Sequence, residues 1–138
     1  MEMNIDCIRD VLSFIVNTQI IDDNLTIVPV QVKDIYDSEK LKAYSKQEIF
    51  YSLTLLKEGE YILCTSSSYS NIVVLFEVIR ITYKGHTFYE SIREQTVWEK
   101  TKSTAKNVGN HTLEFIESIA HDIAVEGVKT ILSMNNTQ

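Results

Sequence analysis

The sequence contains few of the residues that interrupt or cross-link a chain. Its 138 residues include one proline, four glycines and two cysteines. No internal repeat, low-complexity tract or flexible linker is present. With 44% hydrophobic residues, the chain is long enough for a single core but not for two independent ones. We therefore expect one domain.

Long hydrophobic runs are also missing. The longest uninterrupted one, Ile72 to Phe76, falls far short of the roughly 20 residues that span a bilayer. Cys7 and Cys64 lie far apart within apolar patterns, and no secretory signal precedes them. We expect no membrane partner, two reduced core thiols rather than a disulfide, and a cytoplasmic location.

Positive charge is in deficit, because 13 lysines and arginines stand against 19 acidic residues, for a net charge of -6. Such a chain repels phosphate at long range, so a nucleic-acid contact would need a local basic face. From Lys33 to Lys57, five lysines oppose four acidic residues. This balance is too small for a strong phosphate-binding surface.

No catalytic constellation is visible in the sequence. There is no Ser-His-acid set, pair of carboxylates, glycine-rich phosphate loop or cysteine-histidine cluster. His111 and His121 are ten positions apart, and Asp122 adjoins His121 instead of following it by a helical turn. The sequence thus predicts a protein that is not an enzyme and binds no metal or other cofactor.

The most informative stretch is a helix with both ends marked. Ser45 and Glu48 have the spacing of a capping box, in which each side chain bonds to the backbone amide of the other residue. Gly59 is expected to end the helix in the left-handed conformation. The apolar stripe has steps of four and three residues: Ile49, Leu53 and Leu56.

Strand patterns follow and precede this helix. Tyr61 to Thr65 and Ile72 to Ile81 are predicted strands joined by a polar loop, Ser66 to Asn71. Upstream, Leu25 to Val32 is rich in β-branched residues. Because Pro29 has no backbone N–H to donate to a neighbouring strand, this segment is an edge strand at best.

Helices are predicted on both sides of these elements. Asn4 is placed to cap a first helix, Ile5 to Asn17, and Asp37 to Ala43 is a candidate for a short one. A long helix is expected from Tyr83 to Ala105, with a bend near Thr96. A last helix follows Gly109 and Asn110 and carries a broad apolar stripe from Leu113 to Leu132.

Together these elements predict an α+β fold: a winged helix-turn-helix-like domain with a β-hairpin wing and two additional C-terminal helices. We expect a winged-helix core over 1–82 and a helical extension over 83–134, within one domain of residues 1–138. The polar tail, 135–138, is expected to fray.

Three blocks of residues carry a resemblance to a known family. The first, Ile5 to Leu12, has an acidic residue, then Ile-Arg, then Leu. The second covers the capped helix and the following strand: Ser45, Glu48, Ile49, Tyr51, Leu53, Leu55, Leu56, Glu58 and Ile62. The third is the most specific: Thr82-Tyr83-Lys84-Gly85-His86, then Phe88, Ile92-Arg93, Trp98 and Lys102.

In these blocks the chain resembles the uncharacterised bacterial and phage family called domain of unknown function 2513. The resemblance implies a winged-helix-like α+β domain, often encoded by prophages, without an established activity. Where that family tends to have histidine in the capped helix, this chain has Ser52. No role of that histidine can be transferred.

The candidate contact surface is the outer face of the capped helix: Lys46, Gln47, Phe50, Tyr51 and Thr54. Lysine and glutamine suit contacts with double-stranded DNA, whereas Phe50 and Tyr51 suit a protein partner at least as well. A third interpretation packs these residues inside the molecule.

Two functional hypotheses therefore stay open. The first is a DNA-binding regulator of prophage genes that forms a homodimer through its last helix. The second is a protein-interaction module that engages a host or phage protein with Phe50, Tyr51 and Tyr69 as aromatic anchors.

The remaining residues of the family motif are interpreted as structural. Gly85 is expected to permit close packing, and the His86 ring to cap the following helix. Arg93 and Trp98 are expected to tie that helix to the core, with Arg93 paired to Glu90, Glu94 or a helix C-terminus.

Overall fold

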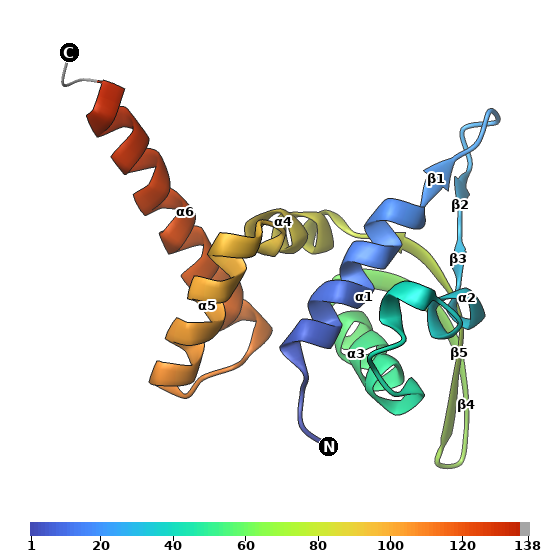
Figure 1. The fold of residues 1–138 in the computed structure, drawn as a ribbon. Coiled ribbons are helices and arrows are strands. Elements are labelled where there is room, and N and C mark those ends of the chain that lie inside the picture. The colour runs from blue at the N-terminus through green and yellow to red at the C-terminus, as the bar shows by residue number, and fades with distance from the viewer. Residues whose placement is uncertain (136–138) are drawn as a thin grey trace. The chain divides into compact units, whose positions relative to one another are not determined.

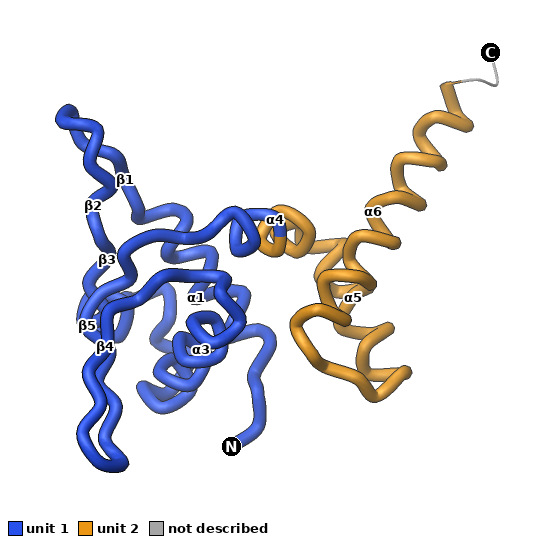
Figure 2. Tube along the Cα trace, turned by 180° about the vertical axis from the view of Figure 1, so that it is seen from behind, with its two compact units in different colours: residues 1–87 blue, residues 88–138 orange. Residues whose placement is uncertain are grey.

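The computed structural model describes residues 1–135 and divides the chain into two compact units (Figure 2). Unit 1 runs from Met1 to Thr87 and unit 2 begins at Phe88. The described residues form a mixed α+β fold with six α-helices and two small antiparallel sheets, which confirms the predicted α+β class. The sequence predicted one domain with an extension from residue 83, and the boundary between the units falls inside the helix that begins there.

The elements follow one another along the chain as labelled in Figure 1. Unit 1 contains α1 (Ile5–Thr18), β1 (Ile20–Ile21), β2 (Ile27–Val28), β3 (Val30–Gln31), α2 (Val32–Tyr36), the 3-10 helix η1 (Glu39–Leu41), α3 (Lys46–Glu58), β4 (Ile62–Tyr69) and β5 (Ile72–Ile81). Helix α4 (Tyr83–Ile92) spans the boundary, and unit 2 continues with α5 (Gln95–Val108) and α6 (Leu113–Asn135).

The first helix forms as predicted and ends one residue later. The Asn4 side chain accepts a hydrogen bond from the backbone N–H of Cys7 at 3.1 Å, which satisfies one of the amides left free at a helix start. One face of α1 is buried at helical spacing: Cys7, Ile8, Val11, Leu12 and Ile15. This face packs on α3 in the core of unit 1.

The predicted capping box of α3 is confirmed. Ser45 Oγ accepts from the Glu48 amide at 3.1 Å, and Glu48 Oε1 accepts from the Ser45 amide at 3.2 Å. The prediction for the other end is wrong, because Gly59 has a φ of -78° and the left-handed residue is Glu60, with a φ of 63°. Glycine instead provides space here, since a Cβ at position 59 would lie 2.6 Å from the Tyr61 ring.

The predicted edge strand from Leu25 to Val32 is broken into shorter pieces. Pro29 separates β2, which pairs with β1 in a hairpin, from β3, which pairs with β5. Val32 is the first residue of α2 and not part of a strand. The predicted short helix from Asp37 to Ala43 is only the 3-10 turn η1.

The three-stranded sheet has the order β3-β5-β4, and both strand pairs are antiparallel. The ladder between β4 and β5 skips Ile79 and Phe76 of β5, so this strand carries two β-bulges. Each extra residue shifts the alternation of the β5 side chains between the two faces of the sheet by one position. As a result the residues of β5 that face the core are three positions apart: Leu75, Val78 and Ile81.

The predicted wing loop, Ser66 to Asn71, is mostly strand. Strand β4 continues through three serines to Tyr69, because β5 offers an uninterrupted partner as far as Ile72. Only Ser70 and Asn71 lie between the two strands, and Ser70 takes the left-handed conformation with a φ of 57°. Regular pairing with β5 outweighs the turn preference of serine.

The predicted long helix from Tyr83 to Ala105 is two helices, with Arg93 and Glu94 between α4 and α5. The Glu94 carboxylate caps α5, accepting from the amides of Thr96 at 3.1 Å and Val97 at 2.8 Å. The predicted bend near Thr96 is therefore a break just before it, where a side chain takes over the hydrogen bonds of a new helix start.

In unit 2, α5 and α6 pack against each other. Gly109 ends α5 with a φ of 80°, and the buried residues of the two helices are Trp98, Thr101, Ala105, Leu113, Ile116, Ile119 and Ala120. Asn135, predicted to fray, ends α6, and the rest of that tail lies outside the described residues. No helix within residues 1–135 is long and apolar enough to cross a membrane.

Candidate partner-binding surface

The outer face of α3 is exposed only at its N-terminal turn. Lys46 and Gln47 are exposed, whereas Phe50, Tyr51 and Thr54 are half-buried. Lys46 Nζ lies 5.0 Å from the centre of the Tyr36 ring, within the range of a cation–π contact. The five predicted contact residues therefore share one face, but it offers a polar end and partly covered aromatic side chains.

Two of the five lysines from Lys33 to Lys57 contact an acidic or polar side chain. Lys42 forms an ion pair with Glu39 at 3.4 Å, and Lys57 Nζ donates to Ser66 Oγ at 2.7 Å. Lys42 lies at the end of η1, before α3, and Lys57 lies in the last turn of α3 and reaches β4. Of these two contacts, only the pair with Glu39 opposes a positive charge with a negative one, and the local balance stays at five lysines against four acidic residues.

The outer part of the β4–β5 hairpin, residues 66–76, exposes several large apolar side chains, and we call it the distal ribbon. It extends beyond the helices of this unit (Figures 1 and 2). Tyr69 is 82% exposed, Ile72 64% and Phe76 52%, and Val73 and Val74 are also exposed. No residue of the distal ribbon carries a charge.

Of these exposed residues, sequence reasoning identified only Tyr69. It interpreted Ile72 to Ile81 as a long apolar strand, and such a pattern ordinarily predicts burial on at least one face. The strand is exposed here because the hairpin is longer than the body beneath it. Polar residues along the facing strand, Ser66 to Ser68, are the one sequence signal that could have indicated exposure.

A second exposed apolar element is the β1–β2 hairpin. Ile20, Ile21 and Leu25 are exposed, and Leu25 has a left-handed φ of 61°, a conformation that bulky residues rarely adopt. The Asp22 carboxylate holds this turn by accepting from the amides of Asn24 at 2.9 Å and Thr26 at 3.0 Å. Unlike the distal ribbon, this hairpin carries acidic side chains.

The family motif around Gly85 joins β4, β5 and α4. Thr82 Oγ1 donates to the carbonyls of Glu60 at 2.7 Å and Tyr61 at 3.0 Å, and it accepts from the Gly85 amide at 3.0 Å. A Cβ at Gly85 would overlap the carbonyl oxygen of Tyr61. Thr82 thus supplies the cap that we predicted for His86, and Gly85 provides the close packing.

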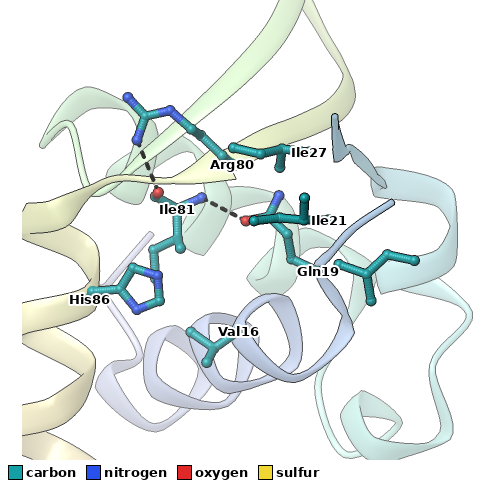
Figure 3. A pocket seen from close by; sticks show the side chains of 8 residues that line it. Val16, Gln19, Ile21, Ile27, Arg80, Ile81 and His86 are labelled. Carbon is teal, nitrogen blue, oxygen red and sulfur yellow. Dashed lines mark hydrogen bonds between the residues drawn. The ribbon is translucent and has the colours of Figure 1, made fainter. Parts of the chain in front are cut away.

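His86 lies instead in the wall of a cavity of about 260 Å³ within unit 1 (Figure 3). Across this cavity the Gln19 side chain bonds to the edge of β5, donating to the Ile79 carbonyl at 2.9 Å and accepting from the Ile81 amide at 3.1 Å. Arg80 Nη1 donates to the Ile81 carbonyl at 3.2 Å. The remaining walls are apolar, from Val16, Ile20, Ile21 and Ile27.

Arg93 and Trp98 have different environments. Arg93 forms an exposed ion pair with Glu90 at 3.0 Å, one of the partners considered from the sequence. Trp98 is buried in unit 2, and Lys102 Nζ lies 5.8 Å from its ring centre. Their structural role stays a prediction.

Metal-binding groups and thiols are two kinds of reactive site that bear on the chemistry of the described residues. Within residues 1–135, no group of three or more histidine, cysteine or acidic side chains is placed to hold a metal ion. Both cysteines are free, and burial is the main cause that raises the pKa of the Cys7 and Cys64 thiols. A raised pKa keeps a thiol protonated and weakly nucleophilic at neutral pH.

Comparison with known proteins identifies one family. The family described as Hypothetical protein (DUF2513) matches residues 2–111, a segment that includes all of unit 1 except Met1 and all of α5. Searches of curated proteins and of solved structures gave no match. Because the matched segment covers more than half of the chain and contains the three blocks that suggested the resemblance, the chain belongs to the DUF2513 family.

Proposed function

We propose that this protein is a winged-helix-like binding module without catalytic activity, and that it contacts a protein of the bacterial host or phage through its distal ribbon. The order of elements supports the winged-helix interpretation: apart from the added β1–β2 hairpin, α1 is followed by the short strand β3, by α2 and α3 and by the β4–β5 hairpin, and β3 pairs with β5. In this interpretation α3 is the second helix of the helix-turn-helix pair and the β4–β5 hairpin is the wing.

The observation that carries the proposal is the composition of the exposed ribbon. Tyr69, Ile72 and Phe76 present aromatic and aliphatic surface to water on a segment without charge. Burying apolar surface contributes about 25 cal/mol per Å², and contiguous exposed patches of this kind mark interaction sites. A ribbon that lay along a phosphate backbone would instead need cationic side chains.

A second candidate function is DNA binding through α3. The observation that favours it is the exposure of Lys46 and Gln47 at the N-terminal turn of this helix, the part of a recognition helix that contacts base edges in helix-turn-helix proteins. Against it stand the net charge of -6 and the lack of any lysine or arginine in the distal ribbon.

Binding to mixed-sequence duplex DNA over a salt series separates the two candidates. The protein-binding proposal predicts no saturable binding even at low salt. An affinity that falls steeply with salt, and that weakens in the Lys46→Ala, Gln47→Ala double variant, would favour DNA binding. The Lys33→Ala variant is the control for a general loss of positive charge.

The protein contact itself is tested by a photo-crosslinking residue placed at position 69 in bacterial cells, with position 33 as the control. The proposal predicts a defined crosslinked product from Tyr69 and none from Lys33, both of which are exposed. The absence of any protein product from position 69, while the variant remains folded, would contradict the proposal.

A further inference from the structure

We infer that the partner of the wing is a second copy of this chain, paired antiparallel through strand β4 so that the two three-stranded sheets become one continuous sheet. This inference rests on the proposed function, because it names the protein that the wing contacts. Three observations support it: strand β4 is an open edge of the sheet, the residues around it carry no charge, and its side chains match those of a second copy.

Strand β4 is an edge strand along its whole length. It contains eight residues, Ile62–Tyr69, and within residues 1–135 it pairs with β5 alone. In an antiparallel ladder, alternate residues direct their N–H and C=O groups away from the existing partner. The outer side of β4 therefore offers a row of backbone donors and acceptors that only another extended chain can satisfy as a set.

This edge lacks the features with which proteins protect an exposed strand, namely charged side chains, proline, a bulge or short length. β4 has no charged residue and no proline, and both bulges of the sheet fall on β5. The opposite edge is protected: β3 is two residues long, follows Pro29 and leads directly into α2. β5 pairs with β3 only at Val78 and Glu77, so residues 72–76 of β5 form a second, shorter open edge. The eight residues of β4 form the longer open edge.

The charge distribution favours a second copy as the occupant. Two chains of net charge -6 repel each other, so copies approach most readily through a neutral surface. No residue from 61 to 76 is charged. Lys57 does contact β4 through Ser66 Oγ. Ser66 lies opposite the buried Leu75, so this contact is on the face of the sheet that carries the core and not along its edge.

The side chains of β4 also match their own copy. Antiparallel pairing of a strand with itself is two-fold symmetric, so every favourable contact occurs twice. With Ser66 opposite Ser66, Leu63 of one copy lies opposite Tyr69 of the other, and Thr65 lies opposite Ser67. Leu63 and Tyr69 are both exposed in the single chain, and aliphatic–aromatic and hydroxyl cross-strand pairs are among the stabilising ones.

Charge substitution at Ser67 tests this pairing. Ser67 is exposed and pairs within its own sheet with uncharged Val74, while in the paired copies the two residues 67 are diagonal neighbours. Sedimentation velocity should show a concentration-dependent dimer of the wild type. Ser67→Glu and Ser67→Lys should each raise the dimer dissociation constant by about tenfold or more, because a charge at an edge opposes pairing, and an equimolar mixture of the two variants should recover the dimer.

Two variants serve as controls. Gln47→Glu changes the net charge as Ser67→Glu does, but on exposed α3, so it should leave the dimer intact. Leu132→Glu adds a charge to the exposed part of α6, through which the sequence predicted a homodimer. If the dimer survived both Ser67 variants and was lost only in Leu132→Glu, it would form through α6 and the β4 inference would be overturned.

Failure of this inference is distinguishable from failure of the proposed function. A wild type that stays monomeric at every concentration, while position 69 crosslinks to a different protein, would overturn the second copy and leave the wing as a protein contact. If position 69 gave no crosslinked protein of any kind, both the second copy and the proposed protein contact would be overturned. A crosslinked homodimer from position 69, together with recovery of the dimer in the Glu and Lys mixture, would support both.

Discussion

Gly85 packs directly against the backbone of Tyr61. A Cβ at position 85 would overlap the Tyr61 carbonyl oxygen and lie 2.7 Å from Cγ1 of Ile81, and the same carbonyl accepts hydrogen bonds from Thr82 N and Oγ1, each at 3.0 Å. This contact explains why the Thr82–His86 segment of the family motif needs its glycine: it fastens the start of α4 to the end of the loop that enters β4.

Gly85→Ala should therefore destabilise unit 1. Overpacking of this kind costs about 1–3 kcal/mol, and the overlapping atom belongs to backbone that cannot rotate away. Urea unfolding followed by circular dichroism measures the loss. Gly127→Ala is the matched control, because nothing lies within 4 Å of a Cβ there, and alanine in a helix interior should stabilise by about 1 kcal/mol. Equal effects of the two substitutions would contradict this packing account.

Gln19 extends the sheet with its side chain. Its amide bonds to the carbonyl of Ile79 and the N–H of Ile81, just beyond the position where β3 stops pairing with β5. Gln19→Ala should cost about 1–2 kcal/mol and accelerate hydrogen exchange at the Ile81 amide. Gln47→Ala, at an exposed site, should change neither quantity. Unchanged protection of Ile81 in Gln19→Ala would refute the role of this side chain.

The Ser45 cap is a local determinant of α3. Ser45→Ala removes the oxygen that accepts from the Glu48 amide, and loss of such a cap costs about 1 kcal/mol. Ser45→Asp keeps an acceptor at this position and should stay close to the wild type in the free energy of unfolding. If both variants lost the same amount, the cap would not be the cause.

Two carboxylates that cap helices make the stability of the protein depend on pH. The Asn4 hydrogen bond, followed by the Ser45 amide, lowers the pKa of Glu48, and the amides of Val97 and Thr96 lower the pKa of Glu94. A folded-state pKa below the unfolded value stabilises the protein above the unfolded pKa, and this contribution is lost as pH falls through the folded pKa. Stability should therefore decline in the acidic range where carboxylates become protonated.

The assignment is checked by NMR titration of the Glu48 carboxyl in Asn4→Ala. The pKa should rise toward its ordinary value, because the hydrogen bond from Asn4 Nδ2 to Glu48 Oε2, 2.7 Å long, is its largest cause. The pKa of Glu94 should not change in this variant. A Glu48 pKa that did not move would rule out Asn4 as the cause.

What the sequence predicts correctly here is local. The caps at Asn4 and Ser45, the stripe of α3 and the presence of two long strands follow from neighbours within a few residues, and each is found. The end of α3 was wrong because Tyr61, packed over Gly59, decides which residue turns left-handed. The break before α5 was predicted only as a bend near Thr96, because glutamate is an uncommon N-cap.

Exposure of the distal ribbon could not be read from the sequence for a different reason. Apolar residues from Ile72 to Phe76 have the same pattern whether or not another layer covers them. What leaves them exposed is the length of the hairpin relative to the body of unit 1, together with two bulges that turn only Leu75, Val78 and Ile81 of β5 inward. Both are properties of the assembled sheet.

The most direct test of the central claim uses one double variant, Ile72→Ser with Phe76→Ser. It measures the free energy of unfolding and the yield of the product crosslinked from position 69. Both side chains are exposed, so the account predicts a free energy of unfolding within about 0.5 kcal/mol of the wild type and loss of the crosslinked product formed from position 69. A product formed at the wild-type yield, or a loss of several kcal/mol in stability, would contradict the claim that the distal ribbon is a contact surface.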